Sequence, residues 1–204
     1  MDLLENILKK VDFVLVGGGM AATFLKAESY EIGKSIVEND HLQVAADLMN
    51  RAKNNGARFI LPLDVIVTEE IKPDAKATVV LVNNIQPNQR IVDIGPETIK
   101  AFNNTLRGCE TVFWNGPMGI FEIPQFSEGT RTMANTIAAL KGTTVIGGGS
   151  TAEIVTSLKL ADKMSLVSTG GGASLQFLGG QKLPGVEALL DKDSPVAARL
   201  KVRR

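Results

Sequence analysis

Short apolar runs rich in β-branched residues alternate along this chain with longer segments whose apolar residues recur at helical spacing. The runs are almost continuously apolar, as expected for strands buried on both faces of a parallel sheet. The pattern predicts an α/β fold: a doubly wound, mainly parallel sheet with helices on both faces, giving a Rossmann-like three-layer sandwich. The expected strands are DFVLVG (12–17), ARFILP (57–62), TVVLV (78–82), TVFWN (111–115), TTVIG (143–147) and MSLVS (164–168).

Helices are expected between these strands. Pro96 suits a first helical position, whereas Gly56 and Gly108 are typical of residues that end a helix. The expected helices are LLENILKKV (3–11), MAATFLKA (20–27) and the segments 37–56, 95–108, 126–140 and 151–160.

Three runs of three glycines, at 17–19, 147–149 and 170–172, each follow an expected strand. Glycine allows close backbone approach, and a helix that starts there offers unpaired N–H groups and the positive end of its dipole. One such run is explained by a tight turn. Three runs at the carboxyl edge of one sheet favour the binding of an extended anionic ligand such as a nucleotide.

The phosphate-binding motifs of other nucleotide-binding classes do not fit these runs. None of them reads G-x-x-x-x-G-K-[ST], so a Walker-type loop is absent. VGGGMAATF lacks the third glycine of G-x-G-x-x-G, and no acidic residue about 20 positions further on clearly ends a second strand. A dehydrogenase is therefore disfavoured.

The run FWNGPMGIFE, residues 113–122, begins in an expected strand and leaves it through an Asn-Gly-Pro turn. Met118 and Phe121 could offer apolar faces to a purine ring, and Glu122 could accept hydrogen bonds from ribose hydroxyls. The alternative is that Trp114, Met118 and Phe121 are core residues and that Glu122 solvates the loop. Spacing alone does not decide between a nucleoside-binding loop and a packed one.

The composition limits the classes of partner and the kinds of metal site and disulfide that can be expected. The 22 basic and 22 acidic residues cancel, which gives no reason to expect nucleic acid or an anionic membrane as a partner. No run of about 18 apolar residues and no signal-peptide pattern occurs, so a cytoplasmic location is expected. Cys109 and His41 are the only cysteine and histidine, which excludes an intrachain disulfide and metal sites built on several His and Cys ligands. We expect His41 at the surface and Cys109 at least half-buried.

The sequence resembles phosphoglycerate kinase through VGGGMAATFLKA, LPLDVIV, VDIGP, VFWNGPMGIFE, VIGGG and STGGGASLQFLGGQKLPGVEAL. These motifs occur in the family's order, cover nearly all of residues 1–190, and match only the carboxyl-terminal half of the family. By this resemblance residues 1–190 are the lobe that binds Mg²⁺ with ADP or ATP, and the tail 191–204 has no assignment. The implied enzyme is a glycolytic phosphotransferase that moves phosphoryl between 1,3-bisphosphoglycerate and ADP.

The resemblance also implies roles for individual residues. Gly18 and Gly19 would form part of the adenine pocket, Asn115 and Pro117 its facing wall, and Glu122 would bind the ribose hydroxyls. The residues implied near the nucleotide phosphates are Gly147, Gly148, Gly149, Ser150 and Thr151. The residues implied near the transferring phosphoryl group are Gly148, Gly171 and Gly172.

The chain departs from the family at three points. It lacks the whole substrate lobe, and it lacks a lysine-bearing segment that Lys9 and Lys10 do not replace. Ser150 stands where the family usually has an aspartate facing the magnesium-nucleotide, so the metal ligands are not predicted. Ser150 and Glu153 fit an S-x-x-E capping box; the alternative is that Ser150 contacts phosphate or a magnesium-bound water, or that Glu153 restores the lost charge.

From these observations we expect a monomer that binds an adenine nucleotide, is inactive alone, and needs the missing substrate lobe as its partner. The alternative is a non-catalytic adenine-nucleotide-binding module, arising from a split gene or a degenerate paralogue.

Overall fold

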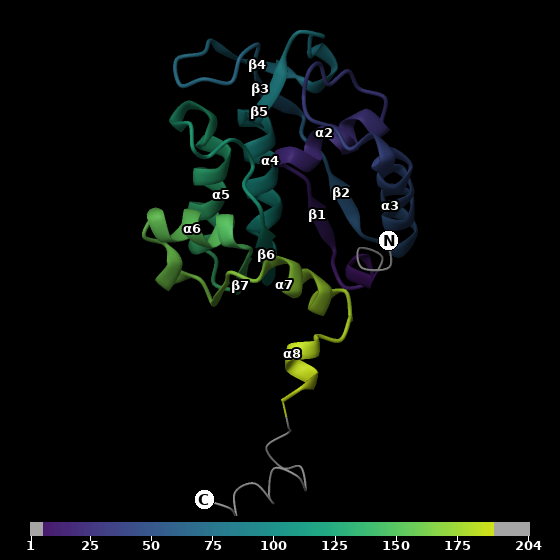
Figure 1. Cartoon of the computed structure of the whole chain (residues 1–204), viewed down its shortest axis with the longest axis vertical. Coiled ribbons are helices and arrows are strands. Elements are labelled where there is room, and N and C mark those ends of the chain that lie inside the picture. The colour runs from purple at the N-terminus through teal and green to yellow at the C-terminus, as the bar shows by residue number, and fades with distance from the viewer. Residues whose placement is uncertain (1–5, 190–204) are drawn as a thin grey trace, which may run out of the picture.

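The computed structural model describes residues 6–189, which form an α/β fold of small sheets with helices packed around them (Figure 1). The α/β class is confirmed. The single doubly wound sheet is wrong for the described residues, because their strands form two separate parallel sheets and one antiparallel sheet. Among these residues no helix has both the length and the apolar character needed to cross a bilayer.

The two parallel sheets carry the strands that precede the glycine runs. One sheet is two-stranded and the other three-stranded, with β7 in the middle. At the carboxyl end of the larger sheet, Gly147 pairs with both Asn115 and Ser168. The members are β1 (Phe13–Leu15) with β2 (Arg58–Ile60), and β6 (Thr111–Asn115), β7 (Thr143–Gly147) and β8 (Leu166–Ser168).

The antiparallel sheet has β3 (Asp64–Thr68) between β4 (Ala77–Leu81) and β5 (Arg90–Ile94). The run TVVLV had been assigned to the parallel sheet, but it forms the antiparallel edge strand β4, with Val79 54% exposed. β3 and β5 were not predicted from the sequence. Each of these strands carries a buried aspartate, Asp64 or Asp93, that interrupts an otherwise apolar run.

The helices follow most of the expected segments. Pro96 lies in the first turn of its helix, and Gly56 ends another in the left-handed conformation with φ 80°. The segment 37–56 begins with a 3₁₀ turn, Asn39–His41, and His41 is exposed there, as expected. Of the expected first helix, residues 1–5 lie outside the described residues. The α-helices are α2 (Gly18–Ala27), α3 (Leu42–Asn55), α4 (Pro96–Leu106), α5 (Glu128–Ala138), α6 (Gly149–Ser157), α7 (Gly171–Leu178) and α8 (Pro184–Glu187).

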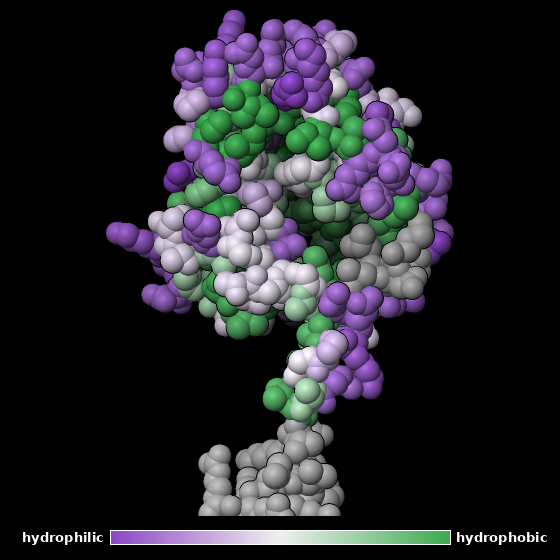
Figure 2. Space-filling view, in the orientation of Figure 1, coloured by the Kyte–Doolittle hydropathy of each residue, from purple (hydrophilic) through white to green (hydrophobic). Residues whose placement is uncertain are grey.

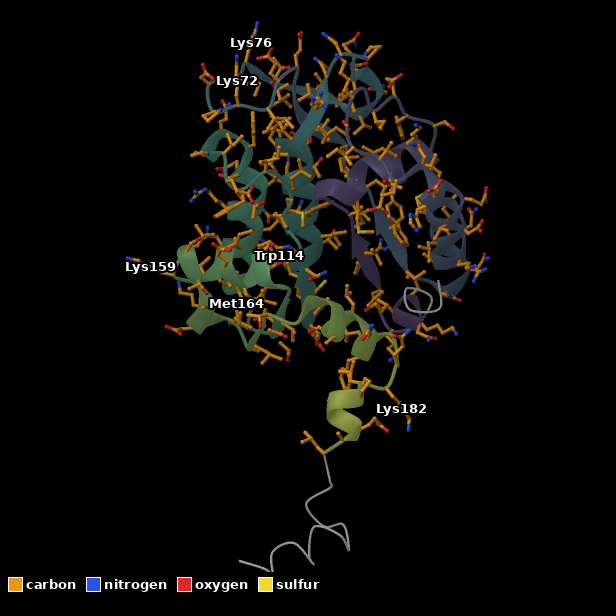
Figure 3. All side chains as sticks on the ribbon, in the orientation of Figure 1. Lys72, Lys76, Trp114, Lys159, Met164 and Lys182 are labelled. Carbon is orange, nitrogen blue, oxygen red and sulfur yellow. The ribbon has the colours of Figure 1, made fainter. Side chains whose placement is uncertain are left out.

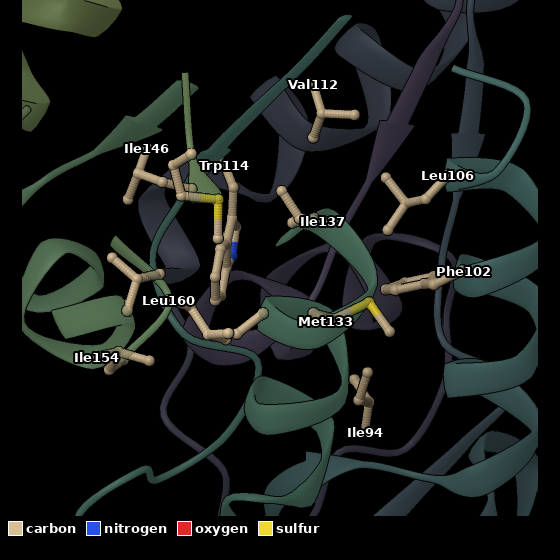
Figure 4. Close-up of a cluster of buried hydrophobic side chains, with 13 residues drawn as sticks. Ile94, Phe102, Leu106, Val112, Trp114, Met133, Ile137, Ile146, Ile154 and Leu160 are labelled. Carbon is tan, nitrogen blue, oxygen red and sulfur yellow. The ribbon is translucent and has the colours of Figure 1, made fainter. Parts of the chain in front are cut away.

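The main apolar cluster packs β6 and β7 against α4, α5 and α6 (Figure 4). Trp114 is only 5% exposed inside it, and its indole Nε1 has no hydrogen-bond partner. A second cluster packs α2 and α3 against the β1–β2 sheet, where the rings of Phe24 and Phe59 stack with centroids 5.4 Å apart. The β1–β2 sheet therefore contacts both clusters, because Leu15 and Ile60 also pack against the main one.

A buried polar network joins β3 to the start of α4. The carboxylate of Asp64 accepts hydrogen bonds from the backbone N–H of Thr98 at 2.8 Å and of Glu97 at 3.1 Å. The hydroxyl oxygen of Thr98 accepts from the N–H groups of Leu63 at 2.9 Å and Asp64 at 3.1 Å. A strand carboxylate therefore caps a helix that has no side-chain cap from its own N-cap residue.

We expect Thr98→Val to lower the free energy of unfolding by about 1–3 kcal/mol, because it leaves buried N–H groups without an acceptor. Thr105→Val is the matched control, since the Thr105 hydroxyl only donates to Ala101 O within α4 at 3.1 Å. Chemical denaturation of both variants measures the difference. Equal losses would contradict a structural role for the Thr98 network.

Candidate functional site

The three glycine runs start helices at the carboxyl ends of parallel strands, as the sequence predicted. Gly17 is the N-cap residue of α2 after β1, Gly148 that of α6 after β7, and Gly170 that of α7 after β8. None of these N-cap residues makes a side-chain cap hydrogen bond. The positive dipole ends of three helices thus face the carboxyl edge, where the N–H groups of Gly18 and Gly171 already donate to Met118 O at 2.9 Å and Thr169 O at 3.2 Å.

The first glycine run touches the loop that follows β6. Gly18 N donates to Met118 O at 2.9 Å. A Cβ at Gly17 would lie 2.4 Å from Met118 Sδ, and one at Gly18 would lie 2.3 Å from Pro117 O. Gly18 also has φ +60°, so a side chain there would be both strained and obstructed.

The second and third runs meet around the side chain of Asn115. A Cβ at Gly148, where φ is +95°, would lie 2.7 Å from Asn115 Oδ1, and one at Gly171 would lie 3.0 Å from the same atom. A Cβ at Gly171 would also lie 2.7 Å from the Cα of Gly148. The starts of α6 and α7 are therefore in direct backbone contact, with Asn115 beside both. We call residues 17–19, 147–149 and 170–172, with the loop 115–118, the glycine edge.

Of the first three polar residues that follow Gly149 in α6, one is buried and two are exposed. Thr151 is 1% exposed, and its hydroxyl oxygen accepts from Gly116 N at 2.7 Å, which fixes the loop to α6. Ser150 and Glu153 are exposed. The capping-box interpretation is wrong, because Gly148 is the N-cap and Ser150 already lies inside the first turn of α6.

The packing of the FWNGPMGIFE run agrees with the packed alternative for its apolar residues. Trp114 is core, and Met118 and Phe121 are half-buried against the same cluster. The guanidinium of Arg131 lies 5.2 Å from the centroid of the Phe121 ring. Glu122 is exposed in the turn beyond Phe121, outside the contacts that join the loop to the glycine runs. Of the sequence-predicted residues, Gly19, Gly149 and Gly172 have open space where a Cβ would lie.

Two residues that were not predicted from the sequence, Thr130 and Asp93, support the loop 115–118 on the side of α5. The hydroxyl oxygen of Thr130, at the start of α5, accepts from Met118 N at 3.0 Å and Gly119 N at 3.2 Å. Asp93 accepts from Gly129 N at 2.8 Å and from Ile94 N at 2.9 Å. The signal for Asp93 was the VDIGP motif, an acidic residue within a strand, whereas Thr130 had no distinguishing pattern.

Asp93 is 1% exposed, and this burial raises the pKa of its carboxyl from 3.8 to about 7. The hydrogen bonds from Gly129 and Ile94 oppose the rise, and the nearby charge of Glu128 adds to it. A Cβ at Gly119 would lie 2.4 Å from Asp93 Oδ1, so the loop packs directly on this carboxyl.

The lysines that Figure 3 labels project from the periphery of the fold, on the antiparallel end, beside α6 and beside α8. Lys10 donates from Nζ to Leu178 O at 3.0 Å, at the end of α7 opposite the glycine edge. Among the described residues no group of three or more His, Cys, Asp or Glu side chains could hold a metal ion. Cys109 is half-buried as expected, and burial raises the pKa of its thiol.

Comparison with known proteins identifies the class to which this fold and site belong. The phosphoglycerate kinase family profile matches residues 1–181. The chain is 50% identical over 189 residues to phosphoglycerate kinase from Roseiflexus sp. strain RS-1, covering 93% of this chain and 48% of the relative. It also resembles the structure of phosphoglycerate kinase from Coxiella burnetii, with a TM-score of 0.87 and 45% identity over 91% of this chain and 48% of that one.

The structure of phosphoglycerate kinase from Pyrococcus horikoshii OT3 shares the fold at a TM-score of 0.75 and 25% identity, again over 48% of its length. The family that these matches define is one of glycolytic kinases. This chain belongs to the phosphoglycerate kinase family. The chain spans about half the length of the relatives it matches.

The pKa of Asp93 predicts a specific dependence of stability on pH. Because its pKa is raised on folding, ionising the buried carboxyl costs free energy. The contribution of Asp93 is therefore complete below pH 4 and is lost as the pH rises through about 7. We expect the unfolding free energy of the wild type minus that of Asp93→Asn to fall from pH 4 to 7, by at most about 1.4 kcal/mol per pH unit.

Urea unfolding of both proteins at several pH values measures this difference, and Asn supplies the non-titrating reference. If this free-energy difference instead rises with pH, the hydrogen bonds from Gly129 and Ile94 would lower the pKa of Asp93 by more than burial raises it.

Proposed function

We propose that this chain is the carboxyl-terminal, nucleotide-binding lobe of a phosphoglycerate kinase and that it binds Mg-ADP or Mg-ATP at the glycine edge. The observation that carries this proposal is the meeting of three uncapped helix N-termini around the loop 115–118. Backbone amides and aligned dipoles suit a polyphosphate without needing a Walker-type lysine.

The nucleoside lies between the first glycine run and the loop. Gly18 and Gly19 form one wall of the adenine pocket, and Asn115 and Pro117 form the other. The open space over Gly19 supports this position, because a planar ring can approach the backbone there. Glu122 is exposed beyond the end of the loop, and its carboxylate accepts hydrogen bonds from the ribose hydroxyls.

The phosphates lie over the starts of α6 and α7. Gly147, Gly148 and Gly149 let the backbone approach them, and Ser150 offers an exposed hydroxyl in the first turn. Thr151 acts indirectly, because its hydroxyl holds Gly116. Mg²⁺ keeps several waters and is bound chiefly through the nucleotide phosphates, so it does not need a cluster of protein carboxylates.

Phosphoryl transfer depends on positioning and charge neutralisation rather than on covalent chemistry from the protein. Gly148, Gly171 and Gly172 lie nearest the transferring group, with Gly172 facing open space. The acceptor site belongs to the half of the relatives that this chain does not match, so the chain alone is inactive. Mixing it with the separately produced remaining half of the Roseiflexus enzyme and assaying ATP formation tests the proposal.

A non-catalytic adenine-nucleotide-binding module is the second candidate. Ser150 favours it, because this exposed position at the phosphate end carries a neutral hydroxyl where the family usually has a carboxylate. ATP formation with the added half identifies a split enzyme, and nucleotide binding without ATP formation identifies a module.

We expect Glu122→Ala to weaken the binding of ADP by roughly 1–3 kcal/mol, because the ribose hydroxyls lose a charged acceptor. Glu110→Ala is the matched control: Glu110 is also exposed but lies at the amino end of β6, opposite the glycine edge. Isothermal titration of the two variants and the wild type measures the effect. Identical affinities for all three would contradict the ribose assignment.

Ser150→Asp should raise the affinity for Mg-ADP and lower it for ADP in chelator. A carboxylate in the first turn of α6 attracts the metal but repels bare phosphates, whereas serine leaves the helix dipole to favour the anion. Ser157→Asp adds the same charge in the last turn of α6 and should leave both affinities within about twofold, because dipole effects fade within a turn. Shifts of the same sign for the two ligands in Ser150→Asp would mean that this position does not face the phosphates.

A further inference from the structure

The chain contains two Asn-Gly pairs, Asn55–Gly56 and Asn115–Gly116. Asn-Gly is the dipeptide most prone to deamidation, because glycine has no side chain to hinder its backbone nitrogen as that nitrogen attacks the preceding side-chain amide. Both asparagines are exposed, so water reaches each of them. Any difference in reactivity between the two pairs must therefore come from the structure around the glycine nitrogen.

The deamidation reaction needs only the chain and water. The glycine nitrogen loses its proton to solvent base and forms a bond to Cγ of the asparagine. The bond from Cγ to Nδ2 then breaks, and ammonia leaves after taking up a proton. Water opens the resulting cyclic imide at either carbonyl and gives aspartate or isoaspartate, with no change of oxidation state. The reaction is slow where the glycine N–H is held in a hydrogen bond or where the asparagine side chain cannot turn toward it.

The first pair leaves the glycine nitrogen accessible. Asn55 is the last residue of α3, where helices fray, and Gly56 follows in the left-handed conformation with φ 80°. Gly56 N donates to Lys53 O at 3.4 Å, which is longer than the usual distance of about 2.7–3.2 Å. A Cβ at Gly56 would meet no atom within 4 Å, and Figure 2 shows hydrophilic side chains along the outer side of α3. The Gly56 proton is therefore easily lost to solvent.

The second pair holds both the nitrogen and the side chain. Gly116 N donates to the hydroxyl oxygen of Thr151 at 2.7 Å, and Thr151 is only 1% exposed. Asn115 ends β6, and its pairing with β7 fixes its backbone. Its Oδ1 lies so close to the glycine runs that a Cβ at Gly148 or Gly171 would be 2.7 Å or 3.0 Å away. This part of the structure must open before the Gly116 proton can leave.

We propose that Asn55 is a site of spontaneous deamidation in this protein and that the Thr151 hydroxyl protects Asn115 from the same reaction. The two pairs share the dipeptide and the exposure of the asparagine, so these features do not distinguish them. The hydrogen bond to Gly116 does. Thr151 is thus a protecting residue that acts on Asn115 through the nitrogen of Gly116, and this role requires no bound ligand.

The two sites differ in the consequences of deamidation. A carboxylate at Asn55 would lie at the negative end of the α3 dipole, and isoaspartate would lengthen the backbone just before Gly56. We therefore expect the last turn of α3 to loosen there. A carboxylate at Asn115 would instead lie beside the starts of α6 and α7 and repel phosphates. Only this last consequence rests on the proposed function.

Incubation of the protein in mildly alkaline buffer, with and without denaturing guanidinium chloride, tests the proposal. Trypsin releases the two sites in separate peptides, 54–58 and 108–131, and mass spectrometry follows the conversion of each with time. In the folded protein we expect Asn55 to convert at least about tenfold faster than Asn115, and in guanidinium the two rates should agree within about threefold. Asn54 is the internal control, because the side chain of the residue after it hinders the attack.

Two substitutions at Thr151 separate the hydrogen bond from packing. Thr151→Val keeps the shape of the side chain but removes the acceptor, so Asn115 should deamidate about five- to tenfold faster with the Asn55 rate unchanged. Thr151→Ser keeps the hydroxyl and should leave both rates within about twofold of the wild type. Hydrogen exchange of the Gly116 amide should rise in Thr151→Val and not in Thr151→Ser, because exchange also requires loss of that proton.

Equal rates at the two sites in the folded protein, or a faster reaction at Asn115, overturn the proposal. A tenfold difference that persists in guanidinium overturns it as well, because local sequence rather than the fold would then set the rates. So does a folded Thr151→Val variant in which Asn115 stays as slow as in the wild type. If that variant does not fold, amide exchange in the wild type decides: the proposal fails unless Gly116 exchanges at least about tenfold more slowly than Gly56.

Nucleotide titration of the same samples separates this inference from the proposed function. A protein that shows the expected deamidation rates but binds no nucleotide contradicts the nucleotide site and supports the protection of Asn115. Nucleotide binding with equal deamidation at both sites does the reverse.

Discussion

The close backbone contact at the glycine edge is the constraint on which the rest of the structure depends. Gly17 and Gly18 lie against Met118 and Pro117, and Gly148 lies against Gly171, at distances that admit no Cβ. Glycines lose more conformational freedom on folding than other residues, so the edge opposes folding. The apolar clusters beneath it, one around Trp114 and one around Phe24, offset this cost. The two apolar clusters therefore stabilise the fold, whereas the glycine edge destabilises it.

The distribution of helix caps follows from the same constraint. The amino ends of α4 and α5 receive carboxylates from the antiparallel sheet, Asp64 from β3 and Asp93 from β5. The amino ends of α2, α6 and α7 have no side-chain cap from their N-cap residues and lie at the glycine edge. The antiparallel sheet thus satisfies the amino ends of α4 and α5, and α5 supports the loop 115–118 through Thr130. The helix ends that face the edge present the positive ends of their dipoles to a ligand, with the N–H groups of Gly18 and Gly171 already bonded within the chain.

The sequence predicted the features that depend on local pattern. Strand runs, helix starts at glycine, and Pro96 in a first turn all follow from side-chain spacing and backbone preference, and the structure confirms them. Sheet partnership depends on distant residues, so β4 was placed in the wrong sheet and β3 and β5 were missed. The same limit explains Ser150: S-x-x-E fits a cap locally, but Gly148, which lies beside Asn115 and Gly171 with φ +95°, is the N-cap residue of α6. Thr130 was missed because its role exists only once the loop lies over α5.

The division of the parallel strands into two sheets links folding to function. A continuous parallel sheet is what the apolar runs predict. In the structure the β1–β2 sheet packs on the cluster around Phe24 and, through Leu15 and Ile60, on the cluster around Trp114 that also supports β6 and β7. The two parallel sheets meet at the glycine edge through the hydrogen bond from Gly18 to Met118, and beneath it through Leu15 and Ile60. A ligand that binds across the glycine edge therefore also fixes the separation of β1 and β6. By linkage, ligand binding and the packing of the two sheets favour each other to the same extent where both require the same spacing.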